Sequence, residues 1–269
     1  MRFLQNLLIC AIFAIIWACN PSSKKEDSYE KVGLKAGKTT REIFGGCDTT
    51  TNTGAAVRIQ VWVPSDSSEA SANIRSELNK KIIERINSYA DSASIAANPI
   101  AAKSAKGAYE VFAKNYSGFK KEFRDAPGCW EVELKGDTVM VTPEILIYQL
   151  DHYAFTGGAH PNSFKSLHIF DGQTGKEKEM KKFVSDSLAL LKKVESTFRK
   201  VEKLASDINL EEEGYFLKNN HFFLPANYVF TREGVFFYYN PYEIAPYVKG
   251  AIQFTIPYAE LEGMVRKDF

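Results

Sequence analysis

A histidine in the segment YAFTGGAHPNSF, residues 153–164, is the first candidate for chemistry in this chain. His160 would act as a general base if a nucleophile and an orienting acid lay within hydrogen-bond reach. Asp151, His152 and Ser163 lie near it along the chain. The chain has no GxSxG nucleophile motif, and the Gly-Gly pair suits the positive φ angles of a hairpin turn. We therefore expect a turn between two strands and no catalytic residue, with a catalytic His160 as the alternative.

Histidine spacing also raises the question of a metal site. His152, His160 and His168 are evenly spaced along the chain. Even spacing keeps side chains on one face of a strand, but the Gly-Gly turn breaks that register. A zinc site in an enzyme needs three ligands that converge on one point. We expect neither a metal site nor a cofactor.

A tyrosine-rich loop, NPYEIAPYVKG at residues 240–250, is a stronger candidate for binding. Exposed tyrosines supply contact area with a polar end, and two prolines would stiffen the loop and lower the entropy cost of binding. The alternative is that the tyrosines pack down and tie the loop to a sheet. The candidate binding residues are Tyr239, Tyr242, Glu243 and Tyr247, together with His160.

The N-terminus predicts export and a lipid anchor. Arg2 precedes an uncharged apolar run at residues 7–18, which is too short to span a bilayer comfortably and suits a signal peptide. The run ends in Ile-Trp-Ala-Cys, which resembles a bacterial lipobox, although Trp17 departs from the small or aliphatic residue usual there. We expect residues 1–18 to be a lipoprotein signal peptide and Cys19 to carry the lipid. An ordinary secretory signal is the alternative.

The segment after the lipobox is polar and predicts a flexible tether over residues 19–46. Acyl chains on Cys19 would hold the chain at a membrane without a spanning helix. Lys25-Glu26-Asp27 resembles short acidic signals that export lipoproteins to the cell surface. We expect an envelope location at the outer membrane, and both a periplasmic and a surface-facing orientation stay open.

Cysteine usage predicts one disulfide in the folded body. Four cysteines occur, and two of them lie in the signal and the lipobox. In an exported protein the remaining two, Cys47 and Cys129, most often form a disulfide, which would contribute about 4–5 kcal/mol on the chain-entropy model. A two-cysteine metal site is the rival, but no CxxC motif or neighbouring histidine supports it.

Periodicity of the apolar residues predicts the elements that carry these candidates. Strand-like alternation and helical spacing follow one another twice along the chain. In the first half we expect a strand at 56–64, a helix over 74–93 capped by Ser71, a helix over 105–123, and antiparallel strands at 130–134, 138–141, 145–155 and 163–170. In the second half we expect a helix over 184–204, strands at 222–224, 227–231, 234–239 and 251–256, and a short terminal helix from Pro257.

This order predicts an α+β fold with two tandem modules, 47–170 and 171–269. Each module would have antiparallel strands packed on one face by amphipathic helices. The charge balance of 34 Lys and Arg against 33 Asp and Glu includes no basic block, which argues against nucleic acid as a partner.

Two signatures carry a resemblance to a known family. YAFTGGAH, with Phe155 where tyrosine is common, is similar to the Tyr-x-Tyr-Thr-Gly-Gly-Ala-His segment of the ectodomain shared by RsiV-type anti-sigma factors and PdaC-type peptidoglycan deacetylases. EGVFFYYNPYEIAPYVKGAIQFTIPYAEL, residues 233–261, resembles the second signature of that family. The similarity covers roughly residues 47–264 and implies two domains of largely unknown function on an envelope protein.

The resemblance also implies candidate partners. In the anti-sigma factors the similar ectodomain recognises lysozyme. The acidic cluster Asp207, Glu211, Glu212 and Glu213 would steer such a basic protein, with a solvated helix end as the alternative. Thr-Phe-Asp-Asp and His-x₃₋₄-His metal motifs of the deacetylase are absent from this sequence. We expect a lipid-anchored, non-catalytic envelope protein that binds lysozyme or peptidoglycan. The alternative is a cell-wall hydrolase or deacetylase accessory protein that acts through residues 151–163.

Overall fold

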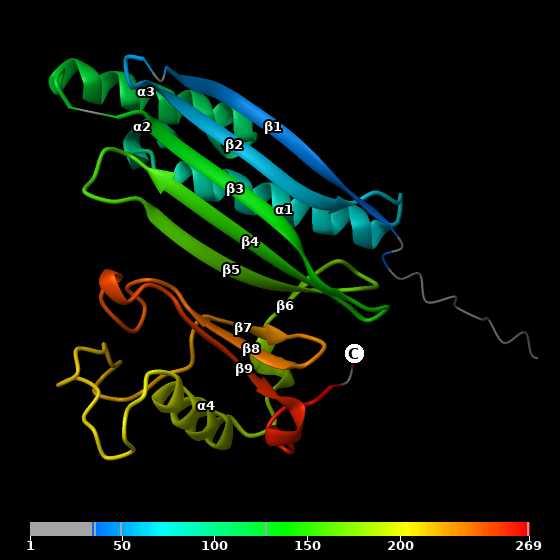
Figure 1. Ribbon diagram of the computed structural model, residues 1–269. Helices are drawn as coiled ribbons and strands as arrows, with labels where there is room; N and C mark the ends of the chain where they lie inside the picture. The colour runs from blue at the N-terminus through cyan, green and yellow to red at the C-terminus, as the bar shows by residue number, and fades with distance from the viewer. Residues whose placement is uncertain (1–33, 35, 49, 127, 268) are drawn as a thin grey trace, which may run out of the picture. The chain divides into compact units, whose positions relative to one another are not determined.

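The computed structural model describes residues 34, 36–48, 50–126, 128–267 and 269 (Figure 1). These residues form a six-stranded sheet, a three-stranded sheet and four α-helices. None of the helices within the described ranges is long and apolar enough to cross a membrane. The predicted signal peptide, residues 1–18, and the lipidation site, Cys19, lie outside the described residues.

The larger sheet follows chain order from edge to edge. Its strands are β1 (Gly37–Asp48), β2 (Thr53–Pro64), β3 (Trp130–Val141), β4 (Ile145–Phe155), β5 (Asn162–Asp171) and β6 (Glu177–Lys178). Neighbouring strands are antiparallel except β2 and β3, which are parallel because the chain crosses between them through helices. The crossing comprises α1 (Glu69–Asn87), α2 (Ser92–Ala96), a 3₁₀ turn (Pro99–Ala102) and α3 (Ala105–Glu122).

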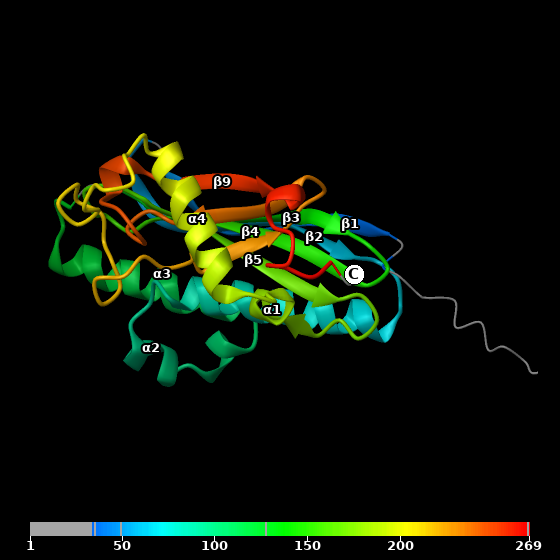
Figure 2. The same cartoon turned by 90° about the horizontal axis from the view of Figure 1, so that it is seen from below.

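Helices cover one face of this sheet, and both views show α1 and α3 on the same side of the strands (Figures 1 and 2). Apolar residues at helical spacing on α1 and α3 meet the inward residues of β2, β3 and β4 in a first core. Ser68 caps α1 by accepting a hydrogen bond from the Ser71 N–H. The predicted cap at Ser71 is therefore wrong by one turn, because that side chain is buried and donates to Asp66 at 2.7 Å.

The second module contains the three-stranded antiparallel sheet. Its elements are a 3₁₀ turn (Met180–Phe183), α4 (Ser187–Val201), β7 (Asn227–Phe230), β8 (Gly234–Tyr239), a 3₁₀ turn (Tyr247–Lys249), β9 (Ile252–Pro257) and a 3₁₀ turn (Tyr258–Glu260). Its core extends into the larger sheet, where Ile145, Ile147 and Ile169 join it. Because side chains alternate along β4, Leu146 and Tyr148 face the helices instead.

The α+β fold with two tandem modules is confirmed, but two boundaries differ from the prediction. Residues 37–46, expected in the flexible tether, belong to β1, which pairs with β2 along its whole length. β1 is an edge strand with mostly exposed side chains, so it lacks the apolar alternation that predicts a strand. The larger sheet also extends beyond residue 170, because β6 pairs with β5.

The predicted disulfide is confirmed. Cys47 and Cys129 are bonded, with their Cα atoms 5.7 Å apart. The bond joins the end of β1 to the residue before β3. It therefore closes a loop that contains β2 and the helices.

Candidate functional site

Three of the predicted binding residues meet in an aromatic cluster, defined here as His160, Tyr242 and Tyr247. His160 lies in the turn between β4 and β5, and both tyrosines lie in the loop between β8 and β9. The His160 ring stacks on Tyr247 with centroids 3.9 Å apart, and Tyr242 lies 5.6 Å from Tyr247. Tyr242 is 52% exposed, so the cluster presents aromatic surface to solvent. The two modules thus build this surface together.

Hydrogen bonds fix the rings of the cluster. The carbonyl of Pro161 accepts a hydrogen bond from the Tyr247 hydroxyl at 3.1 Å and lies 3.0 Å from His160 Nδ1. Because a carbonyl only accepts, Nδ1 carries the hydrogen in this contact, and the Tyr242 hydroxyl lies 3.4 Å from Nε2. The predicted turn is also confirmed: β4 and β5 are antiparallel, and Gly157 has a φ of 85°. His160 therefore acts as part of a fixed aromatic surface.

Glu243 positions the tyrosine loop and does not contribute its carboxylate to the cluster. Its Oε1 accepts from the Ala226 N–H at 2.6 Å, and its Oε2 accepts from the Asn240 N–H at 2.8 Å. Tyr242, between these anchored residues, has a φ of 66°, which is rare for a residue with a side chain. The loop is held in a strained conformation that turns the Tyr242 ring outward.

Tyr239 is not a surface residue, and its assignment to the binding set is wrong. It is fully buried, and its hydroxyl donates to the Phe223 carbonyl at 2.7 Å. Burial raises the pKa of this hydroxyl. Inward residues alternate along β8 through Val235 and Phe237, so the strand period already placed Tyr239 in the core.

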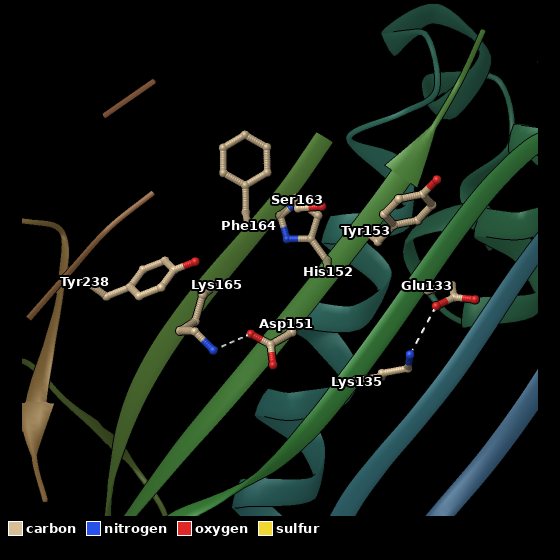
Figure 3. Close-up of a pocket in the computed structure, with 9 residues that line it drawn as sticks. All are labelled: Glu133, Lys135, Asp151, His152, Tyr153, Ser163, Phe164, Lys165 and Tyr238. Carbon is tan, nitrogen blue, oxygen red and sulfur yellow. Dashed lines mark hydrogen bonds and ion pairs between the residues drawn. The ribbon is translucent and has the colours of Figure 1, made fainter. Parts of the chain in front are cut away.

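A cavity of about 280 Å³ lies where β3, β4 and β5 meet Tyr238 of the second module (Figure 3). Lys165 and Asp151 point toward one another across neighbouring strands in Figure 3, with Nζ and Oδ1 2.7 Å apart. The other Asp151 oxygen accepts from Gln149 at 2.5 Å, and Lys165 lies over the Tyr238 ring at 5.3 Å. Burial, together with the charge of Asp151, raises the pKa of Tyr238. Charged pairs and aromatic rings thus line the same small cavity.

His152 also lines the cavity, but its ring is buried and neutral. It stacks on Phe164 at 4.9 Å and packs near Tyr89, which lies just after the C-terminal end of α1. Burial first, and then the charge of Arg85, lower the pKa of His152 to about 4. Its Nε2 has no hydrogen-bond partner among the described residues.

The catalytic arrangement drawn from the sequence is not assembled. Asp151 is engaged by Lys165 and Gln149, and the hydrogen bonds of the described residues include none that joins Asp151 or Ser163 to His152 or His160. Within the described part of the chain, no group of three His, Cys, Asp or Glu side chains is arranged to hold a metal ion.

A polar chain that sequence analysis missed links β5 to β6 and α1. Ser166 Oγ lies 3.0 Å from His168 Nε2, and His168 Nδ1 lies 2.7 Å from Glu177 Oε1. Lys81 pairs with the other oxygen of Glu177 at 2.8 Å. Burial raises the pKa of Glu177, but the hydrogen bonds from His168 and Lys81 outweigh it and lower this pKa to about 2. The Ser-x-His spacing on one strand face was the available signal.

Comparison with known proteins agrees with the two-module architecture. Residues 51–163 match the family described as Deacetylase PdaC, and residues 175–259 match the family described as protein of unknown function (DUF3298). None of the curated proteins compared with the chain matches it.

Two crystal structures share the fold. A member of the DUF3298 family from Bacteroides fragilis NCTC 9343 has 19% identity and a TM-score of 0.65, over 88% of this chain and 95% of that one. A DUF3298 family protein from Pseudomonas aeruginosa PAO1 has 20% identity and a TM-score of 0.59, over 87% of this chain and 97% of that one. The chain therefore carries a region that matches the PdaC family, followed by a region that matches the DUF3298 family, as its resemblance to the RsiV- and PdaC-type ectodomains predicts.

Proposed function

We propose that the chain is a lipid-anchored, non-catalytic binding protein of the cell envelope and that it recognises a lysozyme-type protein. The aromatic cluster carries this proposal, because both modules contribute to it and its outer ring is exposed. Protein interfaces concentrate binding energy in a few such aromatic residues, and rings already fixed by hydrogen bonds lose little entropy on binding. Peptidoglycan is the other envelope partner that the family resemblance suggests.

Charge supports a basic protein as the partner. Asp207 and Glu211-Glu212-Glu213 are exposed on the segment between α4 and β7. Exposed acidic groups speed the encounter with a basic protein, and salt screens this attraction over about 10 Å at 0.1 M. Binding should therefore weaken as salt increases.

The test is a titration with lysozyme of a form that begins at residue 20, which keeps β1 and the disulfide. We expect saturable one-to-one binding that weakens at high salt. Tyr242→Ala should weaken it at least about tenfold, which corresponds to about 1.4 kcal/mol. Ile100→Ala, which removes an exposed apolar side chain from the 3₁₀ turn between α2 and α3, is the matched control and should bind normally.

Absence of lysozyme binding at high micromolar concentrations would overturn the assignment of lysozyme as the partner. Cosedimentation with purified peptidoglycan would then test the other candidate.

Lipid anchoring is tested separately by Cys19→Ser. This change should move the protein from the membrane fraction to the supernatant. Wild-type protein in the supernatant would favour an ordinary secretory signal.

A second candidate function, hydrolysis, rests on the chain of Ser166, His168 and Glu177. An ionised carboxylate only accepts, so His168 Nδ1 donates to Glu177, and His168 Nε2 lies 3.0 Å from the Ser166 hydroxyl. That order matches a nucleophile, base and acid. However, the Leu150 carbonyl, 3.3 Å from Ser166 Oγ, competes for the same hydroxyl proton.

A fluorophosphonate probe separates the two functions, because it labels only an activated serine. Under the binding proposal, Ser166 stays unlabelled. Labelling that is lost in both Ser166→Ala and His168→Ala, and kept in Ser163→Ala, would establish the hydrolase instead.

A further inference from the structure

The face of the larger sheet opposite α1 and α3 carries two rows of mostly polar side chains that run across five strands. Strand pairing defines both rows, because directly paired residues share a face. The first row is Arg41, Gln60, Lys135, Asp151 and Lys165, and the second row is Ile43, Arg58, Glu133, Tyr153 and Ser163. All of these side chains are exposed or half-buried.

These rows line two adjoining cavities, which together are called the groove. The cavity beside Tyr238 and a second cavity of about 190 Å³, over β1, β2 and β3, share Glu133 and Lys135 as lining residues. Figure 3 shows Glu133 and Lys135 beside Asp151 and Lys165 on successive strands. Five strands span about 19 Å, since neighbouring strands lie about 4.8 Å apart. The groove is therefore long enough for a short linear chain of groups rather than for one small molecule.

Most of the charges in the groove are paired with a charge of opposite sign. Arg58 pairs with Glu131 at 2.8 Å, Lys135 with Glu133 at 3.3 Å, and Lys165 with Asp151 at 2.7 Å. A strongly charged ligand would have to break these pairs. An uncharged ligand can instead use their spare donor and acceptor positions, which lie side by side.

Hydroxyl groups match this arrangement, because each one both donates and accepts. Among the described residues, neither the Gln60 amide nor the Tyr153 hydroxyl makes a hydrogen bond, so both are free to meet a ligand. Tyr153 and Tyr238 add ring faces against which the C–H surfaces of a sugar can pack. An extended peptide fits less well, because the sheet uses its own backbone groups within the ladder and leaves none in the groove for a peptide backbone.

We propose that this groove binds a linear, uncharged oligosaccharide, with its rings arranged across the strands from β1 to Tyr238. The groove adds a ligand class to the proposed function and rests on that function in one respect only, namely that the chain is a binding protein. It concerns a surface separate from the aromatic cluster, so each can fail alone.

The test is isothermal titration of the form that begins at residue 20 with uncharged β-1,4-linked oligosaccharides of one to five rings. Two series are used, one of glucose and one of N-acetylglucosamine. Affinity should rise with chain length until the groove is filled. Lys135→Ala and Tyr153→Ala should each weaken binding of the longest oligosaccharide about tenfold.

Two control variants test whether only changes in the groove weaken oligosaccharide binding. Lys103→Ala removes an exposed lysine at the end of the 3₁₀ turn before α3 and should change nothing. Tyr242→Ala should weaken lysozyme binding but leave oligosaccharide binding intact, because it alters only the aromatic cluster. An unchanged melting temperature confirms that each variant is folded.

Absence of saturable binding to both series, or affinity that does not depend on chain length, would overturn the groove proposal even if lysozyme binds. Tighter binding of an uncharged hexapeptide, lost in Lys135→Ala, would overturn it in favour of a peptide ligand. Oligosaccharide binding without lysozyme binding would support the groove and reject the protein partner.

Discussion

The backbone conformation of Tyr242 allows the strain in the binding loop to be measured separately from the contacts of the Tyr242 ring. Its φ of 66° costs about 1–2 kcal/mol for a residue with a Cβ and almost nothing for glycine. We therefore expect Tyr242→Gly to be more stable than Tyr242→Ala by about 1 kcal/mol, although both lose the ring. Guanidinium unfolding of the two variants measures this difference.

The opposite order holds in a helix, where glycine is less stable than alanine. Asn79, exposed on α1, provides the comparison: Asn79→Gly should be less stable than Asn79→Ala. If Tyr242→Ala were as stable as Tyr242→Gly, the loop would relax freely, and strain would not explain how Tyr242 is held outward.

His152 should make the stability of the fold depend on pH. Burial lowers its pKa to about 4, below the unfolded value of about 6.5, so the unfolded chain binds more protons between these two values. Stability is therefore complete above about pH 6.5, falls as the pH drops toward 4, and loses on the order of 3 kcal/mol from this group. Unfolding free energies measured from pH 7 to pH 4 test this slope.

Protonation of carboxylates with lowered pKa values also destabilises the fold at more acidic pH. The contribution of His152 is therefore the difference in slope between the wild type and a His152 variant. His152→Gln should flatten the slope between pH 6.5 and 4. His221→Gln, which changes an exposed histidine, should keep it. Equal slopes in both variants would assign the pH dependence to other groups.

At the scale of elements, the Cys47–Cys129 bond fastens the edge strand β1 to the start of β3. The two cysteines are 82 residues apart in the sequence, and closing a loop of that size restricts the unfolded chain by about 4–5 kcal/mol on the chain-entropy model. We expect the variant with both cysteines replaced by serine to lose about 4 kcal/mol of stability. Denaturant unfolding of this variant beside the wild type measures the loss.

Thiol chemistry provides the control for that measurement. In the form that begins at residue 20, unfolding without reductant should release no thiol, whereas reduction should release two. Release of two thiols without reductant would show that the bond does not form.

Element types were predictable where the apolar pattern is regular, and pairing between distant elements was not. Alternation along 234–239 predicts β8, and the Gly-Gly pair predicts the turn after β4. β1 was missed because its stability comes from its ladder to β2 and not from buried side chains. The parallel pairing of β2 with β3 depends on how the helices between them pack, which local periodicity does not encode.

In the candidate site, too, residue types were predictable and contacts between distant segments were not. The sequence pointed to His160, Tyr242 and Tyr247 by residue type, but their meeting depends on contacts between segments 82 positions apart. The groove was not predicted, because its residues come from five strands and only their register brings them onto one face. Tyr239 was predictable as buried from the period of β8, and residue type alone misplaced it.

At the scale of the whole molecule, two asparagines join the modules by completing the edge of β5. Asn240 Oδ1 accepts from the Lys165 N–H at 2.7 Å, and its Nδ2 donates to the Lys165 carbonyl at 3.0 Å. Asn227, which is buried, accepts from the Leu167 N–H at 2.9 Å. These side chains therefore take the place of a neighbouring strand where β6 ends.

The shared core predicts that both modules unfold together. Ile145, Ile147 and Ile169 of the larger sheet pack within the core of the second module, so separating the modules would expose apolar surface on each. We expect one calorimetric transition, with equal calorimetric and van't Hoff enthalpies.

Asn240→Ala and Asn227→Ala should each lower the stability by about 1–3 kcal/mol, because they leave backbone N–H groups of β5 without partners. The transition should move to lower temperature without splitting, and Asn79→Ala on α1 should leave it in place. Two separate transitions in the wild type would instead show that each module is stable alone, and the aromatic cluster would then lie on a movable joint rather than a fixed surface.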